Sequence, residues 1–197
     1  MDLFEAVARR RSFGRLHPPA PDDHQLRQIL QAAACAPDHG GLRPFRFTIL
    51  RGENLAAFGR VLEQAYLDRC ADSGTDPVPA KADKERTKLG RAPLVVVVSA
   101  VRSPSATIRW EEQVAACAAA AQNALLAATA LGFGSMWRTG DPCYDVRVKT
   151  ALGLQAEDAA VGFLYFGTPS ATAELLKGPK VAHLDGLVQE WRPGRPT

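Results

Sequence analysis

The sequence predicts an α+β fold in which helices cover a small β-sheet. Segments with apolar residues at helical spacing alternate with short apolar runs rich in β-branched residues, in the order α-α-β-α-β-α-β-α-β. The 197 residues contain no internal repeat and no change of composition that would separate two domains, so one domain is expected. We assign it to residues 1–169 and treat residues 170–197, which are polar with little periodicity, as a C-terminal arm or extension of the same domain.

Two helices begin the chain in this prediction. Asp2 is a candidate N-cap for a helix over residues 2–9. Asp22, followed three residues later by Gln25, gives the capping-box pattern for a second helix, which ends before Pro37. A turn of proline, aspartate, histidine and two glycines follows this helix.

A strand, a helix, a loop and a second strand are expected next. The apolar period that starts near Asn54 indicates the helix, and the strands are expected at 45–50 and 94–98. Residues 71–92 are rich in Pro, Gly, Asp and Lys, which indicates a loop with at most one short polar helix near 81–88. The second strand is a continuous apolar run, which is typical of a strand covered on both faces.

A long alanine-rich helix follows and ends near Leu131. No charged residue occurs between Val114 and Leu131, and an uncharged stretch of this length raises the question of a membrane span. The stretch is mostly alanine, which gains little from lipid, and it includes Gln122 and Asn123. We therefore expect a helix that is buried or lies in a subunit interface, and no association with a membrane.

The last elements are a strand, a helix and a strand. Residues 132–137 form a short strand that leaves a glycine turn. Asp141 is a candidate N-cap with Pro142 at the first helical position, and this helix is expected to stop at Gly153. The apolar residues 159–166 form the final strand.

Composition and missing motifs argue against several classes of function. The 24 basic and 21 acidic residues are spread along the chain, unlike the clustered basic face of a protein that binds nucleic acid. The four cysteines lie far apart without a C-x-x-C pair, which is typical of reduced thiols in a cytoplasmic protein. The acidic N-terminus is followed by no apolar segment, so no signal peptide is expected. The sequence also lacks G-x-G-x-x-G, a phosphate loop, G-x-S-x-G and H-E-x-x-H, so we expect neither a metal site nor a catalytic nucleophile.

Basic side chains gather where the first helix ends. Arg10, Arg11 and Arg15 lie within six residues together with the hydroxyl of Ser12. Arginine binds phosphate through two parallel hydrogen bonds, so this cluster suits a phosphate. The same cations also suit the negative end of a helix dipole, and these residues alone leave both interpretations open.

Two further segments place polar groups at the ends of elements. His39 lies in the turn before the first strand and is flanked by Asp38 and two glycines. Trp137, Arg138 and Thr139 end the third strand, where an arginine and a hydroxyl can meet a phosphate. An exposed turn and an ordinary loop explain the same residues, so both interpretations stay open here as well.

A set of short segments becomes informative when its members are taken together. They are Arg10-Arg11-Ser12-x-x-Arg15, Ala36-Pro37-Asp38-His39, Pro44-Phe45-Arg46-Phe47, Arg91-Ala92-Pro93, Gly132-Phe133-Gly134, Trp137-Arg138-Thr139-Gly140 and the run from Val161 to Pro169. In this order and at these spacings they resemble the flavin-dependent nitroreductase family, and its short single-domain bacterial members most of all.

The resemblance implies a nitroreductase-like homodimer with a mixed, mostly antiparallel sheet and an FMN molecule at each of two sites in the subunit interface. The positions that match the phosphate and ribityl contacts of FMN are Arg10, Arg11 and Ser12. A second cofactor-contacting segment matches Trp137, Arg138 and Thr139. His39 matches a residue that reaches FMN from the other subunit.

Three other contacts follow from the resemblance. Arg15 completes the first arginine motif, and Cys35 stands four positions before His39, where some relatives carry a basic residue. A contact with the nicotinamide cosubstrate is implied at the end of the alanine-rich helix, over Ala127, Ala128, Thr129, Ala130, Leu131 and Gly132.

The resemblance also implies a reaction. Hydride would pass from NADH or NADPH through N5 of FMN to a nitroaromatic, a quinone or a similar small-molecule acceptor by a ping-pong mechanism, with no catalytic side chain. The 71–92 loop and the arm are candidates for shaping the acceptor pocket. Three alternatives stay open: dehydrogenating or dehalogenating chemistry on the same flavin fold, a non-catalytic flavin-binding dimer, and a dimer without a cofactor.

Overall fold

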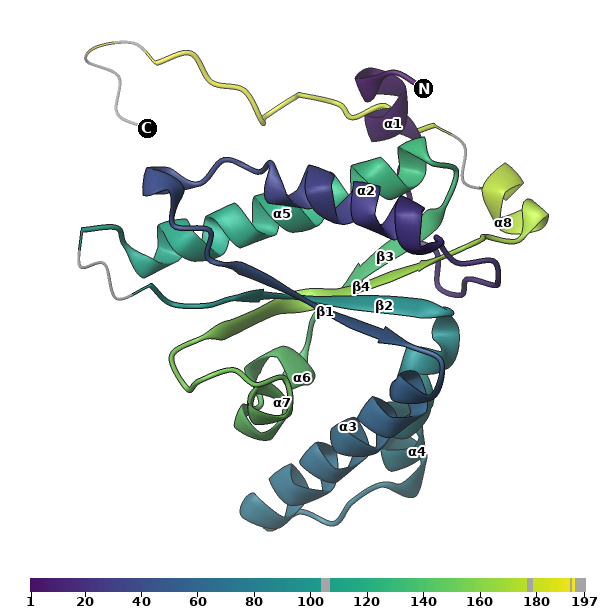
Figure 1. The fold of residues 1–197 in the computed structure, drawn as a ribbon, viewed down its shortest axis with the longest axis vertical. Helices are drawn as coiled ribbons and strands as arrows, with labels where there is room; N and C mark the ends of the chain where they lie inside the picture. The colour runs from purple at the N-terminus through teal and green to yellow at the C-terminus, as the bar shows by residue number, and fades with distance from the viewer. Residues whose placement is uncertain (104–106, 177–178, 192, 194–197) are drawn as a thin grey trace.

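The computed structural model describes residues 1–103, 107–176, 179–191 and 193, and a four-stranded β-sheet forms its centre (Figure 1). The strands are β1 (Phe45–Arg51), β2 (Leu94–Ala100), β3 (Gly134–Arg138) and β4 (Ala159–Gly167). They lie in the order β1-β2-β4-β3, and each pair of neighbours is antiparallel. The predicted strands are therefore confirmed, with small differences at their ends.

Helices cover both faces of this sheet (Figure 1). They are α1 (Leu3–Arg9), α2 (Asp23–Ala34), α3 (Glu53–Asp72), α4 (Pro79–Thr87), α5 (Trp110–Ala130), α6 (Asp141–Tyr144), α7 (Val146–Ala151) and α8 (Ala171–Leu176), with the short 3-10 helices η1 (His39–Gly41) and η2 (Lys88–Arg91). α2 and α5 pack on one face, whereas α3, α4, α6 and α7 lie on the other. This arrangement confirms the predicted α+β fold class.

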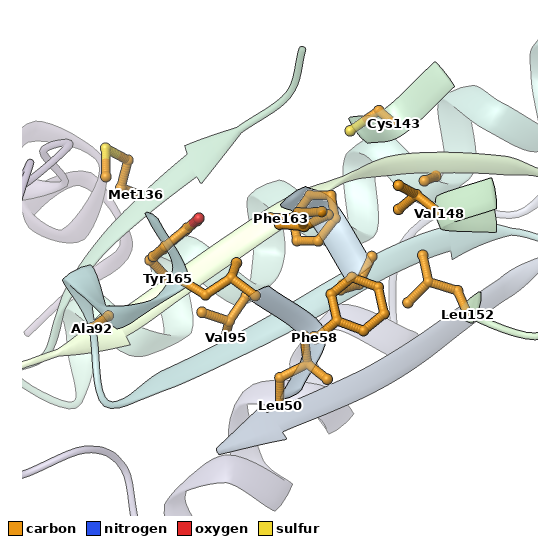
Figure 2. Close-up of a cluster of buried hydrophobic side chains, with 14 of the residues drawn as sticks. Leu50, Phe58, Ala92, Val95, Met136, Cys143, Val148, Leu152, Phe163 and Tyr165 are labelled. Carbon is orange, nitrogen blue, oxygen red and sulfur yellow. The ribbon is translucent and has the colours of Figure 1, made fainter. Parts of the chain in front are cut away.

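Strand β2 is buried on both faces, as its apolar run predicted. Val95 and Val97 belong to the cluster that includes Phe163 and Tyr165 of β4 (Figure 2). Val96 and its alternate neighbours pack instead beneath α5, whose alanines are buried against the sheet. Each fully buried valine contributes about 1.5–3 kcal/mol to folding, so this strand anchors both halves of the core.

Side chains cap the first two helices in the predicted way. An oxygen of Asp2 accepts a hydrogen bond from the backbone N–H of Glu5 (2.8 Å). Asp22 and Gln25 form the reciprocal capping box, with distances of 2.8 and 3.0 Å. A cap of this kind contributes about 1 kcal/mol, which fixes where each helix begins.

The helix predicted from Asp141 to Gly153 is instead two short helices. Asp145 has an extended backbone (ψ 123°) that ends α6, and its carboxylate accepts hydrogen bonds from the N–H groups of Arg147 (2.8 Å) and the next residue (3.4 Å) at the start of α7. Gly140, not Asp141, is the N-cap of α6. The prediction was wrong because Asp145 caps the start of a second helix and so interrupts an otherwise helical pattern.

Residues 71–92 contain more helix than predicted. No side chain of α4 is buried, so the sequence carries no apolar period that would reveal this helix. α4 is held against α3: a Cβ at Gly59 would lie only 2.1 Å from the carbonyl oxygen of Arg86, and the N–H of Val78 donates to the hydroxyl of Tyr66 (2.9 Å). Tertiary packing, rather than local pattern, therefore determines this helix.

The C-terminal arm begins with α8, which the sequence analysis did not predict. Further on, the N–H of Lys180 donates to the carbonyl oxygen of Ala8 (2.9 Å), so the arm passes beside α1 (Figure 1). The large apolar side chains of the arm are exposed, namely Val181, Leu184, Leu187, Val188 and Trp191. Apolar side chains gathered in this way are typical of a surface that another molecule covers.

Candidate functional site

The segment that follows α1 runs along the outer edge of β3. Ser12 forms a parallel bridge with Ser135, and the N–H of Phe13 donates to the carbonyl oxygen of Ser135 (3.1 Å). Trp137 and Arg138 end the same strand and Thr139 follows it, about 7–13 Å beyond Ser135 at about 3.3 Å per residue. The structure thus places Ser12 on the strand that leads into residues 137–139, and a cofactor contact of both segments stays a prediction.

The two adjacent arginines at the end of α1 have different surroundings. The Nη1 group of Arg11 donates to the carbonyl oxygens of Ala8 (2.6 Å) and Arg10 (2.8 Å), so it stabilises the carboxyl end of α1 as the helix-dipole interpretation expects. The half-buried side chain of Arg10 makes no hydrogen bond or ion pair within the part of the chain that the structure describes. Arg10 is therefore available for a phosphate, and the exposed Arg15 lies in the same loop.

The indole ring of Trp137 is fixed against the sheet. Its Nε1 group donates to the carbonyl oxygen of Val161 (3.3 Å), and a Cβ at Gly162 would lie 2.0 Å from the same nitrogen. Because its only donor is already used, this half-buried ring offers a ligand an apolar face rather than a hydrogen bond.

A cleft of about 250 Å³ opens near the end of β3, between the sheet, α4, η2 and α6. Its charged side chains are Lys84, Lys88, Arg91 and Arg138 with the carboxylates Glu85 and Asp141. Lys88 and Glu85 neutralise each other in a largely buried ion pair. The remaining cations outnumber the remaining carboxylate, so the cleft favours an anionic or electron-rich ligand.

Tyr165 supplies a neutral donor at this cleft. Burial raises the pKa of Tyr165 to about 12, although Arg138 and Arg91 act in the opposite direction. The phenol therefore stays protonated at neutral pH and can donate a hydrogen bond beside the cations.

The sequence analysis missed Lys84 and Lys88 as site residues. Both come from the 71–92 segment, which was interpreted mainly as a loop. Their spacing of four residues places both lysines on one face of a helix, and this was the signal that could have found them.

His39 lies at the end of α5 opposite to Ser12. The Nδ1 atom of His39 is 2.5 Å from Oε2 of Glu112, in the first turn of that helix, whereas Ser12 lies beside the strand that follows it. The distance along the helix from Glu112 to Ala130 is about 27 Å at about 1.5 Å per residue. A single chain therefore does not bring His39 together with Ser12, and the exposed Cys35 is the C-cap of α2.

The segment expected to contact nicotinamide forms the end of α5. Ala128 is buried in the core, and the Thr129 hydroxyl donates to the carbonyl oxygen of Leu125 (2.9 Å). Gly132 has φ 87° and ends the helix by donating to the carbonyl oxygen of Thr129 (3.0 Å). Ala130 and Gly132 are exposed and Ala127, Thr129 and Leu131 half-buried, and the nicotinamide contact over residues 127–132 remains a prediction.

Comparison with known protein families identifies the family to which this chain belongs. A model of the Nitroreductase family matches residues 7–168. This chain belongs to the Nitroreductase family. The match spans the 10–12 segment, the His39 turn, the basic cleft and β4, which are the features described above.

Individual members of the Nitroreductase family are similar over most of their length. The Escherichia coli K12 protein named "Putative NAD(P)H nitroreductase YdjA" is 39% identical over 175 residues, which cover 88% of this chain and 91% of that protein. A crystal structure of a nitroreductase-like family protein from Bacillus cereus has a TM-score of 0.77 at 22% identity, covering 97% of this chain and 96% of the other. A second crystal structure, titled as a "putative nitroreductase in complex with FMN" from Desulfovibrio desulfuricans, has a TM-score of 0.70 at 24% identity and covers 96% of each chain. The structural matches establish the nitroreductase fold.

The residues at the edge of β3 fit an FMN molecule. Among the described residues, the buried hydroxyl oxygen of Ser135, in the strand that bridges Ser12, has no hydrogen-bond partner, which costs about 1–3 kcal/mol unless another group supplies one. Arg10 provides an uncommitted cation for the phosphate, and the cleft provides the phenol of Tyr165 and the guanidinium of Arg138. These residues would offer partners of matching chemistry to the phosphate, to the hydroxyl groups and to the hydrogen-bond acceptors of the ring of FMN.

Two other kinds of site were sought in the described residues. The helices found there are too short or too polar to cross a lipid bilayer. Within the same residues, histidine, cysteine, aspartate and glutamate nowhere gather in a group that could hold a metal ion.

The cysteines give a first test of the region around His39. Burial raises the pKa of Cys117 to about 12 and that of Cys143 to about 11, and Cys70 is buried, whereas Cys35 is exposed. Because the thiolate is the reactive form, iodoacetamide is expected to label Cys35 alone in the native protein at pH 8, and all four cysteines after denaturation. Intact mass and peptide mapping measure both results. If Cys35 lies at the FMN site of a partner subunit, FMN slows its labelling; an unchanged rate would remove Cys35 from that site.

Proposed function

We propose that this protein is an FMN-dependent NAD(P)H oxidoreductase that reduces a nitroaromatic, a quinone or a similar small acceptor. The observation that carries the proposal is the bridge between Ser12 and Ser135, which puts the segment after α1 on the strand whose far end lines a basic cleft. Membership of the Nitroreductase family supports the cofactor and the reaction class. When bound, FMN would supply the redox chemistry, hydride transfer between NADH or NADPH and the acceptor.

The side chains of this chain hold and polarise the cofactor. Arg10 binds the phosphate and Ser12 supports the same end of the molecule. At the other end of β3, Arg138 and Lys84 place positive charge around the ring, which favours electron density on it. Tyr165 donates a hydrogen bond that stays available throughout the neutral pH range.

A second copy of the chain completes each site in this proposal. His39 is separated from Ser12 by most of the length of α5, so an antiparallel pairing of two copies would bring the His39 turn of one to the β3 edge of the other. Exposed Leu3, Phe4 and Val7 on α1, together with the apolar arm, offer the kind of surface that an obligate dimer buries. Residues 1–169 would form the FMN-binding domain, and residues 170–197 an arm laid on the partner in a cytoplasmic homodimer.

Anaerobic mixing tests the cofactor and the activity together. The protein loaded with FMN is expected to sediment as a dimer and to lose its yellow colour within seconds of mixing with NADH or NADPH. A flavin-binding protein without activity would stay yellow, and a chain that remains colourless after incubation with FMN would contradict the proposal.

Steady-state kinetics test whether donor and acceptor use one site in turn. Double-reciprocal plots at several acceptor concentrations are expected to be parallel, because the donor product leaves before the acceptor binds. Intersecting lines would show that both substrates bind together and would contradict a shared site. A screen of nitroaromatics, quinones and halogenated compounds then separates nitroreductase activity from other flavin chemistry.

A further inference from the structure

The loop between η1 and β1 contains one residue other than glycine with an unusual backbone conformation. Arg43 has φ 50°, in the left-handed region that residues with a Cβ rarely adopt, and it follows two glycines, Gly40 and Gly41, at φ 71° and 65°. A third glycine would take this conformation without strain, yet the position carries an arginine. Strained residues that their surroundings maintain are concentrated at functional sites, which makes Arg43 a residue to explain.

Neighbouring contacts keep this loop in place. The carboxylate of Asp38 accepts a hydrogen bond from the backbone N–H of Arg43 (2.5 Å). His39 pairs with the first turn of α5, and a Cβ at Gly40 would lie 2.6 Å from Cδ1 of Ile108. The loop therefore presents Arg43 from a fixed backbone rather than from a freely moving turn.

The guanidinium of Arg43 is left without a partner in this arrangement. Its side chain is exposed and makes no ion pair or hydrogen bond within residues 1–103, 107–176, 179–191 and 193. Two carboxylates that contact this loop have other partners, since Asp38 accepts from the backbone N–H of Arg43 and Glu112 of α5 binds His39. An uncommitted guanidinium on a fixed backbone is well suited to bind a carboxylate or phosphate through two parallel hydrogen bonds.

We propose that Arg43 binds an anionic group of the molecule that exchanges electrons with the flavin, and so determines specificity for negatively charged substrates. This inference rests on the proposed function, in which the His39 turn reaches the FMN site of the partner subunit. His39 and Arg43 belong to the same fixed loop, so a dimer that delivers one side chain delivers the other. Arg10 serves the FMN phosphate, which leaves Arg43 for the second ligand: the carboxylate of an acceptor or the 2′-phosphate of NADPH.

Arg43→Gly and Arg43→Gln test this role by different routes, because the first removes charge and strain and the second removes charge alone. If the anion belongs to the acceptor, both variants raise KM for 4-nitrobenzoate about tenfold or more and leave KM for nitrobenzene unchanged. If it belongs to the donor, KM rises for NADPH and stays the same for NADH. Calorimetric titration of the oxidised FMN-bound dimer with benzoate and with NADP⁺ measures the same two affinities without turnover.

Controls separate specificity from folding. Arg43→Gly is expected to melt at or above the temperature of the wild type, Arg43→Lys to keep part of the preference, and Arg27→Gln, which removes an exposed cation from α2, to keep all of it. Unchanged ratios of charged to neutral substrates in both Arg43 variants would overturn the inference while leaving a working flavoenzyme. Failure of the proposed function is distinct, since the wild type would then bind no FMN or would not be reduced by NAD(P)H.

Discussion

Arg10→Ala is expected to raise the Kd for FMN by about 10- to 100-fold. A hydrogen bond to a charged group contributes about 1.5–3 kcal/mol, and about 1.4 kcal/mol corresponds to a factor of ten in affinity. Arg10 is the residue to replace because its neighbour Arg11 already binds the carbonyl oxygens at the end of α1. Titration of the cofactor-free protein with FMN, followed by flavin fluorescence, measures the change.

Arg9→Ala is the matched control for this measurement. Arg9 is the preceding arginine, its side chain is 56% exposed, and it pairs with Glu5 at 2.9 Å on the surface of α1. Its removal is expected to leave FMN binding unchanged and to have little effect on stability. If Arg10→Ala bound FMN as tightly as Arg9→Ala does, the phosphate site would have to be built from other residues.

Arg69→Met is expected to lower the free energy of unfolding by about 3–5 kcal/mol, the usual cost of removing one partner from a buried ion pair. Arg69 of α3 binds Asp145, whose side chain is only 1% exposed, and the variant would leave that carboxylate buried without its cation. The second terminal nitrogen of Arg69 lies 3.9 Å from the carboxylate of Asp141, so the same guanidinium faces both ends of α6. Urea unfolding of the cofactor-free protein measures the stability.

Arg147→Met provides the comparison for Arg69→Met. Arg147 also links α7 to α3, through Asp68 (3.1 Å) and Asp72 (2.6 Å), but these groups are substantially exposed to solvent. We expect a much smaller loss of stability from this variant. If Arg69→Met lowered the free energy of unfolding as little as Arg147→Met does, the backbone N–H groups at the start of α7 would be enough to stabilise the buried carboxylate of Asp145.

Much of the fold could be predicted because local patterns determine it. The capping aspartates Asp2 and Asp22 fix the starts of helices by contacts within four residues, and the valine run of β2 is apolar enough to indicate burial on both faces. The sequence indicated a short polar helix near 81–88, but not how α4 (Pro79–Thr87) packs. Its stability depends on close packing against Gly59 of α3, and no local sequence pattern reports a contact between two helices.

The candidate site was predictable in part for the same reason. Arg10 and Arg138 were predicted from the residue types at element ends and from the family resemblance, and their contacts with FMN stay predictions. Lys84 was missed because it reaches the cleft only through the docking of α4. Residue types alone left two interpretations of Arg11 open, a phosphate contact and a contact with the end of the helix. The structure shows that its guanidinium donates a hydrogen bond to a carbonyl oxygen at the end of α1.

The bridge between Ser12 and Ser135 has a second consequence. β3 is the last strand of the sheet, and an uncovered outer strand offers its backbone N–H and C=O groups to any passing extended chain. Ser12 and Phe13 pair with part of this edge strand. The segment that would bind the phosphate therefore also keeps this part of the edge from pairing with another copy of the chain. If this segment also holds the cofactor, as proposed, substitutions in it would affect both solubility and FMN binding.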